Sequence, residues 1–107
     1  MADPMKIRAT LQGDVAEVKV LINHPMETGQ RKDPSTGETL PVHFIQLVTA
    51  TLNGKPVMEA QWSQAISRNP FFGFRIRGAK AGDRIIVSWS DNRGGNGSIA
   101  TTVPAAG

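Results

Sequence analysis

Apolar and polar residues alternate along most of the chain with the period of two that is typical of β-strands. The alternation is clearest in "MKIRATL" (5–11), "VAEVKVLIN" (15–23) and "FFGFRIRG" (71–78). In the second of these, Ala16, Val18, Val20 and Ile22 would share one buried face. No segment shows a sustained 3.6-residue repeat, and 61–69 has room for one helical turn at most.

Turn residues divide the remaining apolar runs into further strands. "NG" at 53–54 predicts a two-residue hairpin between strands at 42–53 and 55–63, because both central positions of a type I′ turn need positive φ. "AKAGD" and "RGGNG" separate strands at 84–92 and 98–104. Seven short strands in one chain predict an all-β fold, an immunoglobulin-like β-sandwich of about seven strands.

Length and composition are those of a single soluble domain. The chain has 107 residues, of which 39% are hydrophobic and 20% are charged. We expect one domain over 1–107, with loose termini at 1–5 and 104–107. Without cysteine, disulfides, thiol nucleophiles and Cys-ligated metals are excluded. No apolar run is long enough to span a bilayer and no signal peptide is visible, so the chain alone would be cytoplasmic unless a partner exports it.

The polar stretch at 22–47 contains both histidines and raises the question of metal binding. Histidine nitrogen and methionine sulfur suit copper, so a copper-binding sandwich that uses His24 and Met26, with His43 nearby, is the alternative function. A blue-copper centre also needs a cysteine, which is absent. We therefore expect ordinary hydrogen-bonded histidines, no metal and no cofactor.

Catalytic patterns are also weak. No serine lies in G-x-S-x-G, and His24 has no recognisable Asp and Ser partners. The carboxylates of Glu27, Asp33 and Glu38 crowd around "DPSTGE", which predicts a tight solvated turn. "DNRGGNG" precedes no helix that would help to hold phosphate. The chain is predicted not to be an enzyme.

What remains is recognition by surface loops on a rigid scaffold. Alternation lets only one of Phe71 and Phe72 face the core, so the other would anchor a partner or cover one end of the sandwich. The net charge is +3, and six basic residues lie between 68 and 93. They would form a solvated strand face or attract acidic partners; a nucleic-acid site is not expected because no stacking platform is visible. These six are Arg68, Arg75, Arg77, Lys80, Arg84 and Arg93.

Four segments in order resemble a known family: "INHPMETGQRKD", "LPVHFIQLVTATLNGKPV", "SRNPFFGFRIRG" and "GDRIIVSWSDNRG". They are similar to the Z subunit of the bacterial thiosulfate-oxidising (Sox) carrier complex, over about residues 6 to 103. The resemblance implies an immunoglobulin-like sandwich without catalytic activity. It also implies a heterodimer with a Y subunit, whose cysteine carries sulfur intermediates between periplasmic Sox enzymes. Export would depend on the signal sequence of the Y subunit, and contacts with the other Sox enzymes would be transient.

By motif, pairing is expected to use three segments, with no nucleic acid or membrane involved. Met26 and Phe71 would be apolar anchors, and Glu27 and Arg31 would fix the register. The basic residues between 68 and 93 could also dock anionic sulfur species or an enzyme of the cycle. The expected partner-binding residues are His24, Pro25, Met26, Glu27, Thr28, Gly29, Arg31, Lys32, Asn69, Pro70, Phe71, Asp91, Asn92 and Arg93.

Overall fold

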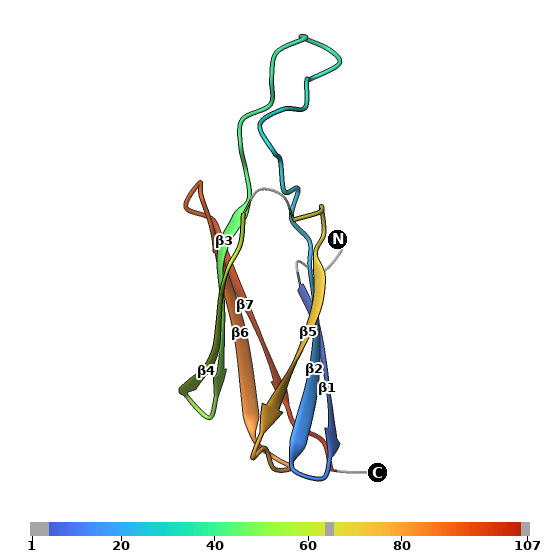
Figure 1. Cartoon of the computed structure of the whole chain (residues 1–107), viewed down its shortest axis with the longest axis vertical. Coiled ribbons are helices and arrows are strands. Elements are labelled where there is room, and N and C mark those ends of the chain that lie inside the picture. The colour runs from blue at the N-terminus through green and yellow to red at the C-terminus, as the bar shows by residue number, and fades with distance from the viewer. Residues whose placement is uncertain (1–4, 64–65, 106–107) are drawn as a thin grey trace.

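The computed structural model describes residues 5–63 and 66–105 as seven antiparallel strands in two sheets (Figure 1). One sheet has three strands in the order β1-β2-β5, and the other has four in the order β4-β3-β6-β7. This confirms the predicted all-β sandwich. The strands are β1 Met5–Gln12, β2 Val15–Ile22, β3 Ile45–Leu52, β4 Lys55–Gln61, β5 Phe71–Arg77, β6 Arg84–Asp91 and β7 Asn96–Thr102.

The position of β4 follows from the turn that precedes it. Asn53 and Gly54 have φ of 52° and 84°, as the two-residue hairpin requires. So short a connection can only place β4 beside β3, with Leu52 opposite Lys55. In constant-type immunoglobulin domains the fourth strand joins the first sheet instead. Here the hairpin keeps that strand in the four-stranded sheet.

The core lies between the inner faces of the two sheets. The alternation predicted for 15–23 is confirmed, because Ala16, Val18, Val20 and Ile22 are fully buried. The opposite wall is formed by alternate residues of β3 and β6. Its fully buried members include Ile45, Val48, Ala50, Ile85 and Val87.

Several boundaries expected from the sequence differ from the structure by a few residues; the last strand, expected over 98–104, is β7 Asn96–Thr102. β3 begins at Ile45 and not at 42, because His43 bridges to Glu27 and leaves the sheet. Met5, expected in a loose terminus, begins β1 and is 4% exposed; the rest of the predicted N-terminal tail, 1–4, lies outside the described residues, as do 106–107. The described part of 61–69, where the sequence left room for one helical turn at most, contains no helix.

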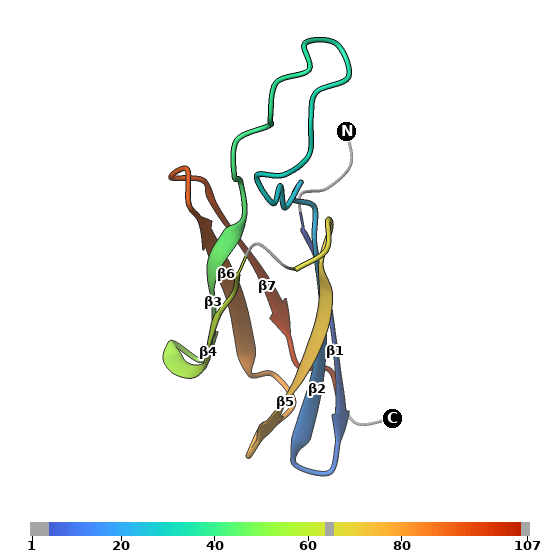
Figure 2. The same cartoon turned by 45° about the horizontal axis from the view of Figure 1, so that its top comes forward.

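A long loop between β2 and β3 gives the molecule its elongated outline, 53 × 25 × 19 Å. Figures 1 and 2 show this connection, residues 23–44, rising well beyond the ends of the strands. We call it the projecting loop. In the described part of the chain no helix is long and apolar enough to cross a membrane.

Candidate functional site

The projecting loop is an irregular hairpin with its own backbone ladder. Isolated bridges join Glu27 to His43 and Lys32 to Thr39, and the N–H of Leu40 donates to the carbonyl of Arg31. At its tip, Asp33 accepts from the N–H of Ser35 and of Gly37, which is the tight turn predicted for "DPSTGE". Backbone hydrogen bonds hold the outer part of the loop, where nearly all of residues 30–39 are exposed.

Gly29 is needed where the two arms of the loop approach each other. Its φ is +85°, in the region that favours glycine. A Cβ at this position would lie 2.4 Å from Cγ2 of Val42 on the opposite arm. The predicted reversal at Gly29 therefore also serves a close packing contact.

A buried cluster of two histidines and one aspartate, the His–Asp–His cluster (His24, His43 and Asp91), fastens the loop to the sandwich. Oδ2 of Asp91 lies 3.0 Å from Nε2 of His24 and 2.8 Å from Nε2 of His43. The two imidazole rings meet edge to face at 4.4 Å between centroids, and Trp89 packs against His24 at 5.3 Å. The cluster therefore joins both ends of the projecting loop to the end of β6.

The hydrogen bonds decide where the protons of the cluster lie. The N–H of Met26 donates to Nδ1 of His24 at 3.1 Å, so the proton of this neutral imidazole is on Nε2, where it is donated to Asp91. The other carboxylate oxygen, Oδ1, accepts the N–H groups of Arg93 and Gly95 at 2.9 and 2.7 Å. Asp91 thus accepts four hydrogen bonds.

This arrangement keeps Asp91 ionised. Burial raises the pKa of Asp91, but the hydrogen bonds from His24, His43 and the two backbone N–H groups outweigh burial. The pKa of this carboxyl therefore lies well below its ordinary value of 3.8. No aspartate partner of His24 was recognisable in the sequence, because Asp91 lies 67 positions away and belongs to no local motif.

Two asparagines complete the attachment of the loop through side-chain hydrogen bonds to its backbone. Oδ1 of Asn69 accepts the N–H of His24 at 3.0 Å, and the N–H of Asn69 donates back to the His24 carbonyl. On the other side, Asn92 accepts the N–H of Phe44 at 2.8 Å and donates to the carbonyl of Val42. These side chains replace the strand ladder where the chain leaves the sheets.

Met26, expected to be an apolar anchor, is almost entirely buried within this chain. It is 4% exposed, has φ of +49°, and its Sδ lies 3.3 Å from the N–H of Ile45. Phe71, the other proposed anchor, is 66% exposed. Alternation predicted that only one of Phe71 and Phe72 faces the core, and in the structure this residue is Phe72.

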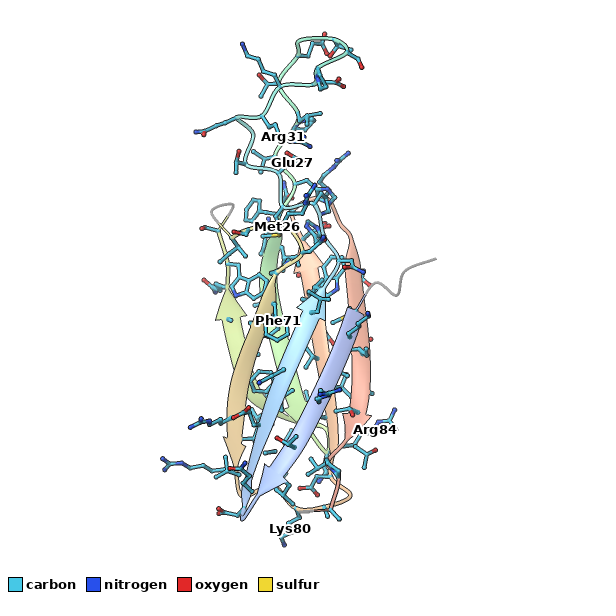
Figure 3. The ribbon with its side chains drawn as sticks, turned by 90° about the vertical axis from the view of Figure 1, so that its right-hand side faces the viewer. Met26, Glu27, Arg31, Phe71, Lys80 and Arg84 are labelled. Atoms are coloured by element: carbon cyan, nitrogen blue, oxygen red, sulfur yellow. The ribbon has the colours of Figure 1, made fainter. Side chains whose placement is uncertain are left out.

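Glu27 and Arg31 form an ion pair on the side of the projecting loop (Figure 3). Nε of Arg31 lies 3.1 Å from one carboxylate oxygen of Glu27, and a second guanidinium nitrogen contacts the other oxygen. The hydrogen bond from Arg31 lowers the pKa of Glu27, and the same bond raises the pKa of Arg31. The Arg31 side chain is 62% exposed, so this pair is available to a partner.

The predicted partner-binding residues gather at one end of the sandwich but divide into two layers. The buried layer holds the loop in place and consists of His24, Met26, Pro70 and Asp91. The outer layer is exposed and consists of Pro25, Thr28, Arg31, Lys32, Asn69, Phe71 and Arg93. Between the two layers lie Glu27, Gly29 and Asn92.

The His–Asp–His cluster has the residue types of a metal site, but both nitrogens of His24 are engaged in hydrogen bonds. Its three ligand atoms lie within 4.8 Å of one another. For His24 to bind a metal through Nε2, its proton would have to move to Nδ1, where it would face the N–H of Met26. The sulfur of Met26 already faces a backbone N–H. The residues therefore do not fit the copper alternative, and His24 also lacks a free nitrogen for general-base chemistry.

The six basic residues between 68 and 93 do not form one patch. Arg75 and Arg77 lie on the outer face of β5, and Arg68 and Arg93 belong to the end with the projecting loop. Figure 3 shows Lys80 and Arg84 at the opposite end. A single docking site made of these six residues is excluded by this placement.

A comparison with protein-family models identifies the family of this chain. The model described as sulphur oxidation protein SoxZ matches residues 5–102, nearly the whole described chain. The chain belongs to the SoxZ family. This confirms the resemblance and implies a role in the Sox sulfur-oxidation system. No curated protein sequence matches the chain.

Proposed function

We propose that this chain is the non-catalytic subunit of a Sox sulfur carrier and pairs with a cysteine-bearing Y subunit. The SoxZ family match over residues 5–102 carries the proposal. The chain has no cysteine of its own. A second thiol near a persulfide could exchange with it, so a cysteine-free scaffold suits a partner that carries sulfur covalently.

The surface that supports pairing is the base of the projecting loop. A hollow of about 350 Å³ there is lined by Pro25, Met26, Glu27, Thr28, Arg31 and Arg68. The His–Asp–His cluster fixes this hollow relative to the sandwich, so a partner would meet a pre-organised surface and lose less entropy on binding. Arg31 and Glu27 offer charged hydrogen bonds at its rim.

The buried layer defines what the chain contributes to the carrier. The polar groups of His24 and Asp91 form hydrogen bonds with each other and with the backbone. This suits a structural role in place of catalysis. Transport of sulfur would then depend on the cysteine of the Y subunit. The pair would act in the periplasm, exported by the signal sequence of the Y subunit.

Co-expression with a Y subunit from the same host tests the proposal. A tag on this chain should retain the Y subunit at equal stoichiometry, with the Y subunit mass raised by sulfur adducts after thiosulfate turnover. Arg31→Glu, which places a carboxylate beside Glu27, should lower retention at least tenfold. Arg84→Glu makes the same charge change at the opposite end and should leave retention unchanged. Failure of the unaltered chain to retain a Y subunit would refute the heterodimer.

A further inference from the structure

The outer face of the three-stranded sheet is cationic and partly apolar. Register pairing places Lys6, Leu21 and Phe71 in one cross-strand row, and Arg8, Lys19 and Gly73 in the next. Further along the strands, Arg75 and Arg77 also point outward, and Glu17 is the one acidic residue among the outward positions of β1, β2 and β5. We call this surface the cationic face; its basic residues are Lys6, Arg8, Lys19, Arg75 and Arg77.

Arg8 and Lys19 lie directly opposite each other in the antiparallel register. Like charges at such positions destabilise a sheet. Glu17 lies 3.6 Å from both Lys19 and Arg75, and no described residue forms an ion pair with Arg8 or Lys6. Folding therefore leaves an excess of positive charge on this face.

A groove of about 580 Å³ runs beside these cations. Its walls include Met5, Ile7, Leu21, Phe71 and Ile99, and Lys6, Arg8 and Lys19 line it as well. Phe71 is 66% exposed, and Figure 3 shows it on the side of the sandwich formed by β1, β2 and β5. An exposed aromatic beside an apolar groove is typical of a protein-binding anchor.

We propose that the cationic face docks an acidic segment of a protein partner, with a large apolar side chain of that segment packed against Phe71 and Leu21. Lys6 and Arg8 are two positions apart on one strand, a separation of about 7 Å. Carboxylates at alternate positions of an extended segment have the same spacing. This docking goes beyond pairing with a Y subunit, because the groove and the hollow at the base of the projecting loop share no lining residue. Phe71, which the motif assigned to pairing, is assigned here to the groove.

Other occupants fit this face less well. A second copy of the chain would bring like charges together. The cations are spread along the strands and do not converge, so a small anion would meet few of them at once. Nucleic acid would use the charge but leave the apolar groove empty, and Phe71 offers a single aromatic ring for stacking.

Titration of the ¹⁵N-labelled chain with a blocked octapeptide tests the docking by NMR. The peptide has glutamates at alternate positions, one central phenylalanine, and serines elsewhere. Amide shifts should be confined to β1, β2 and the start of β5. A matched peptide with glutamine for glutamate should bind at least tenfold more weakly. Absence of shifts on this face at millimolar peptide would overturn the proposal.

Arg8→Glu separates docking from folding. It places a carboxylate opposite Lys19, so the melting temperature should not fall while peptide affinity drops at least tenfold. Phe71→Ala should weaken binding at least fivefold. Lys55→Glu, a charge reversal in β4 of the other sheet, is the matched control. It should change neither the melting temperature nor the peptide affinity. Equal loss of binding in Lys55→Glu would identify a general charge effect and overturn the assignment.

Two further measurements distinguish this surface from other sites. Tighter binding of a thymidine octanucleotide at the same amides would assign the face to nucleic acid and refute an acidic protein segment. Addition of saturating Y subunit should leave the peptide affinity unchanged. If the Y subunit abolishes it, the face belongs to the heterodimer interface and a separate docking surface is refuted, while the proposed pairing stands.

Discussion

Nε2 of His24 lies 3.0 Å from Oδ2 of Asp91, in a buried contact that links the two sheets. His24 follows β2 of the three-stranded sheet, and Asp91 ends β6 of the four-stranded sheet. The same carboxylate oxygen also receives His43, from the far end of the projecting loop. One side chain therefore ties together both sheets and the loop that rises from them.

Replacing Asp91 with asparagine should destabilise the fold strongly. An amide N–H₂ cannot accept hydrogen bonds, so either the two imidazole N–H groups or the backbone N–H groups of Arg93 and Gly95 would lose their acceptor. We expect a loss of about 2–4 kcal/mol in the free energy of unfolding, measured in urea. Glu59→Gln, on the exposed edge strand β4, removes a charge without a buried contact and should change stability by less than about 0.5 kcal/mol. Equal stability of the two variants would contradict the structural role of the cluster.

Stability should fall in acid because of Asp91. Its pKa is lower in the folded chain than in the unfolded chain, so the unfolded state binds the proton more readily as the pH falls. The stabilising contribution is therefore complete above the ordinary pKa of 3.8 and is lost progressively below it. Urea unfolding between pH 5 and pH 2 should show this slope in the unaltered chain, and the slope should be smaller in Asp91→Asn. Identical slopes would assign the acid sensitivity to other carboxyls.

Two glycines of the projecting loop offer a matched comparison. Gly29 and Gly37 both have positive φ, but only Gly29 has no room for a Cβ, because Val42 lies in the way. Gly29→Ala should cost more stability than Gly37→Ala, by about 1 kcal/mol or more, and should also shift the amides of both arms of the loop in NMR spectra. Val42→Ala should recover part of the loss in Gly29→Ala. No difference between the glycine variants would show that the loop relaxes freely around residue 29.

Divalent copper or zinc should not stabilise the chain. The nitrogen of His24 that faces Asp91 carries a proton, and its other nitrogen faces the N–H of Met26. Thermal melts with one equivalent of either metal should match melts with EDTA to within about 1 °C. A rise of several degrees that is lost in His24→Ala would restore the copper alternative.

Asn53 should contribute to the hairpin beyond its turn conformation. Its Oδ1 accepts the N–H of Arg84 at 2.8 Å, and its Nδ2 donates to Asp83 at 3.0 Å. We expect Asn53→Ala to cost about 1–2 kcal/mol of unfolding free energy. Asn96→Ala, at the exposed start of β7, is the control and should be nearly neutral. An unchanged free energy of unfolding in Asn53→Ala would show that glycine at 54 alone determines the turn.

The sequence by itself determined the strands, because period-two alternation depends only on neighbours along the chain. It identified β2 and its buried face, the exposure of one member of the Phe71–Phe72 pair, and the hairpin at Asn53–Gly54. Through that hairpin it also determined the sheet to which β4 belongs. The predicted partner-binding residues could be selected from the sequence as a group. The sequence could not divide them into a buried and an exposed layer.

Only the tertiary structure decided how distant residues meet. The contact of His24 with Asp91 depends on how the two sheets pack against each other. The row of Arg8, Lys19 and Gly73 depends on strand register, and a shift of one residue would turn these side chains to the other face. For the same reason the basic residues between 68 and 93 separate in space, while Lys6, Arg8 and Lys19 join Arg75 on one surface. Charge can be counted along a sequence, but its position on the molecule is set by the pairing of strands far apart in that sequence.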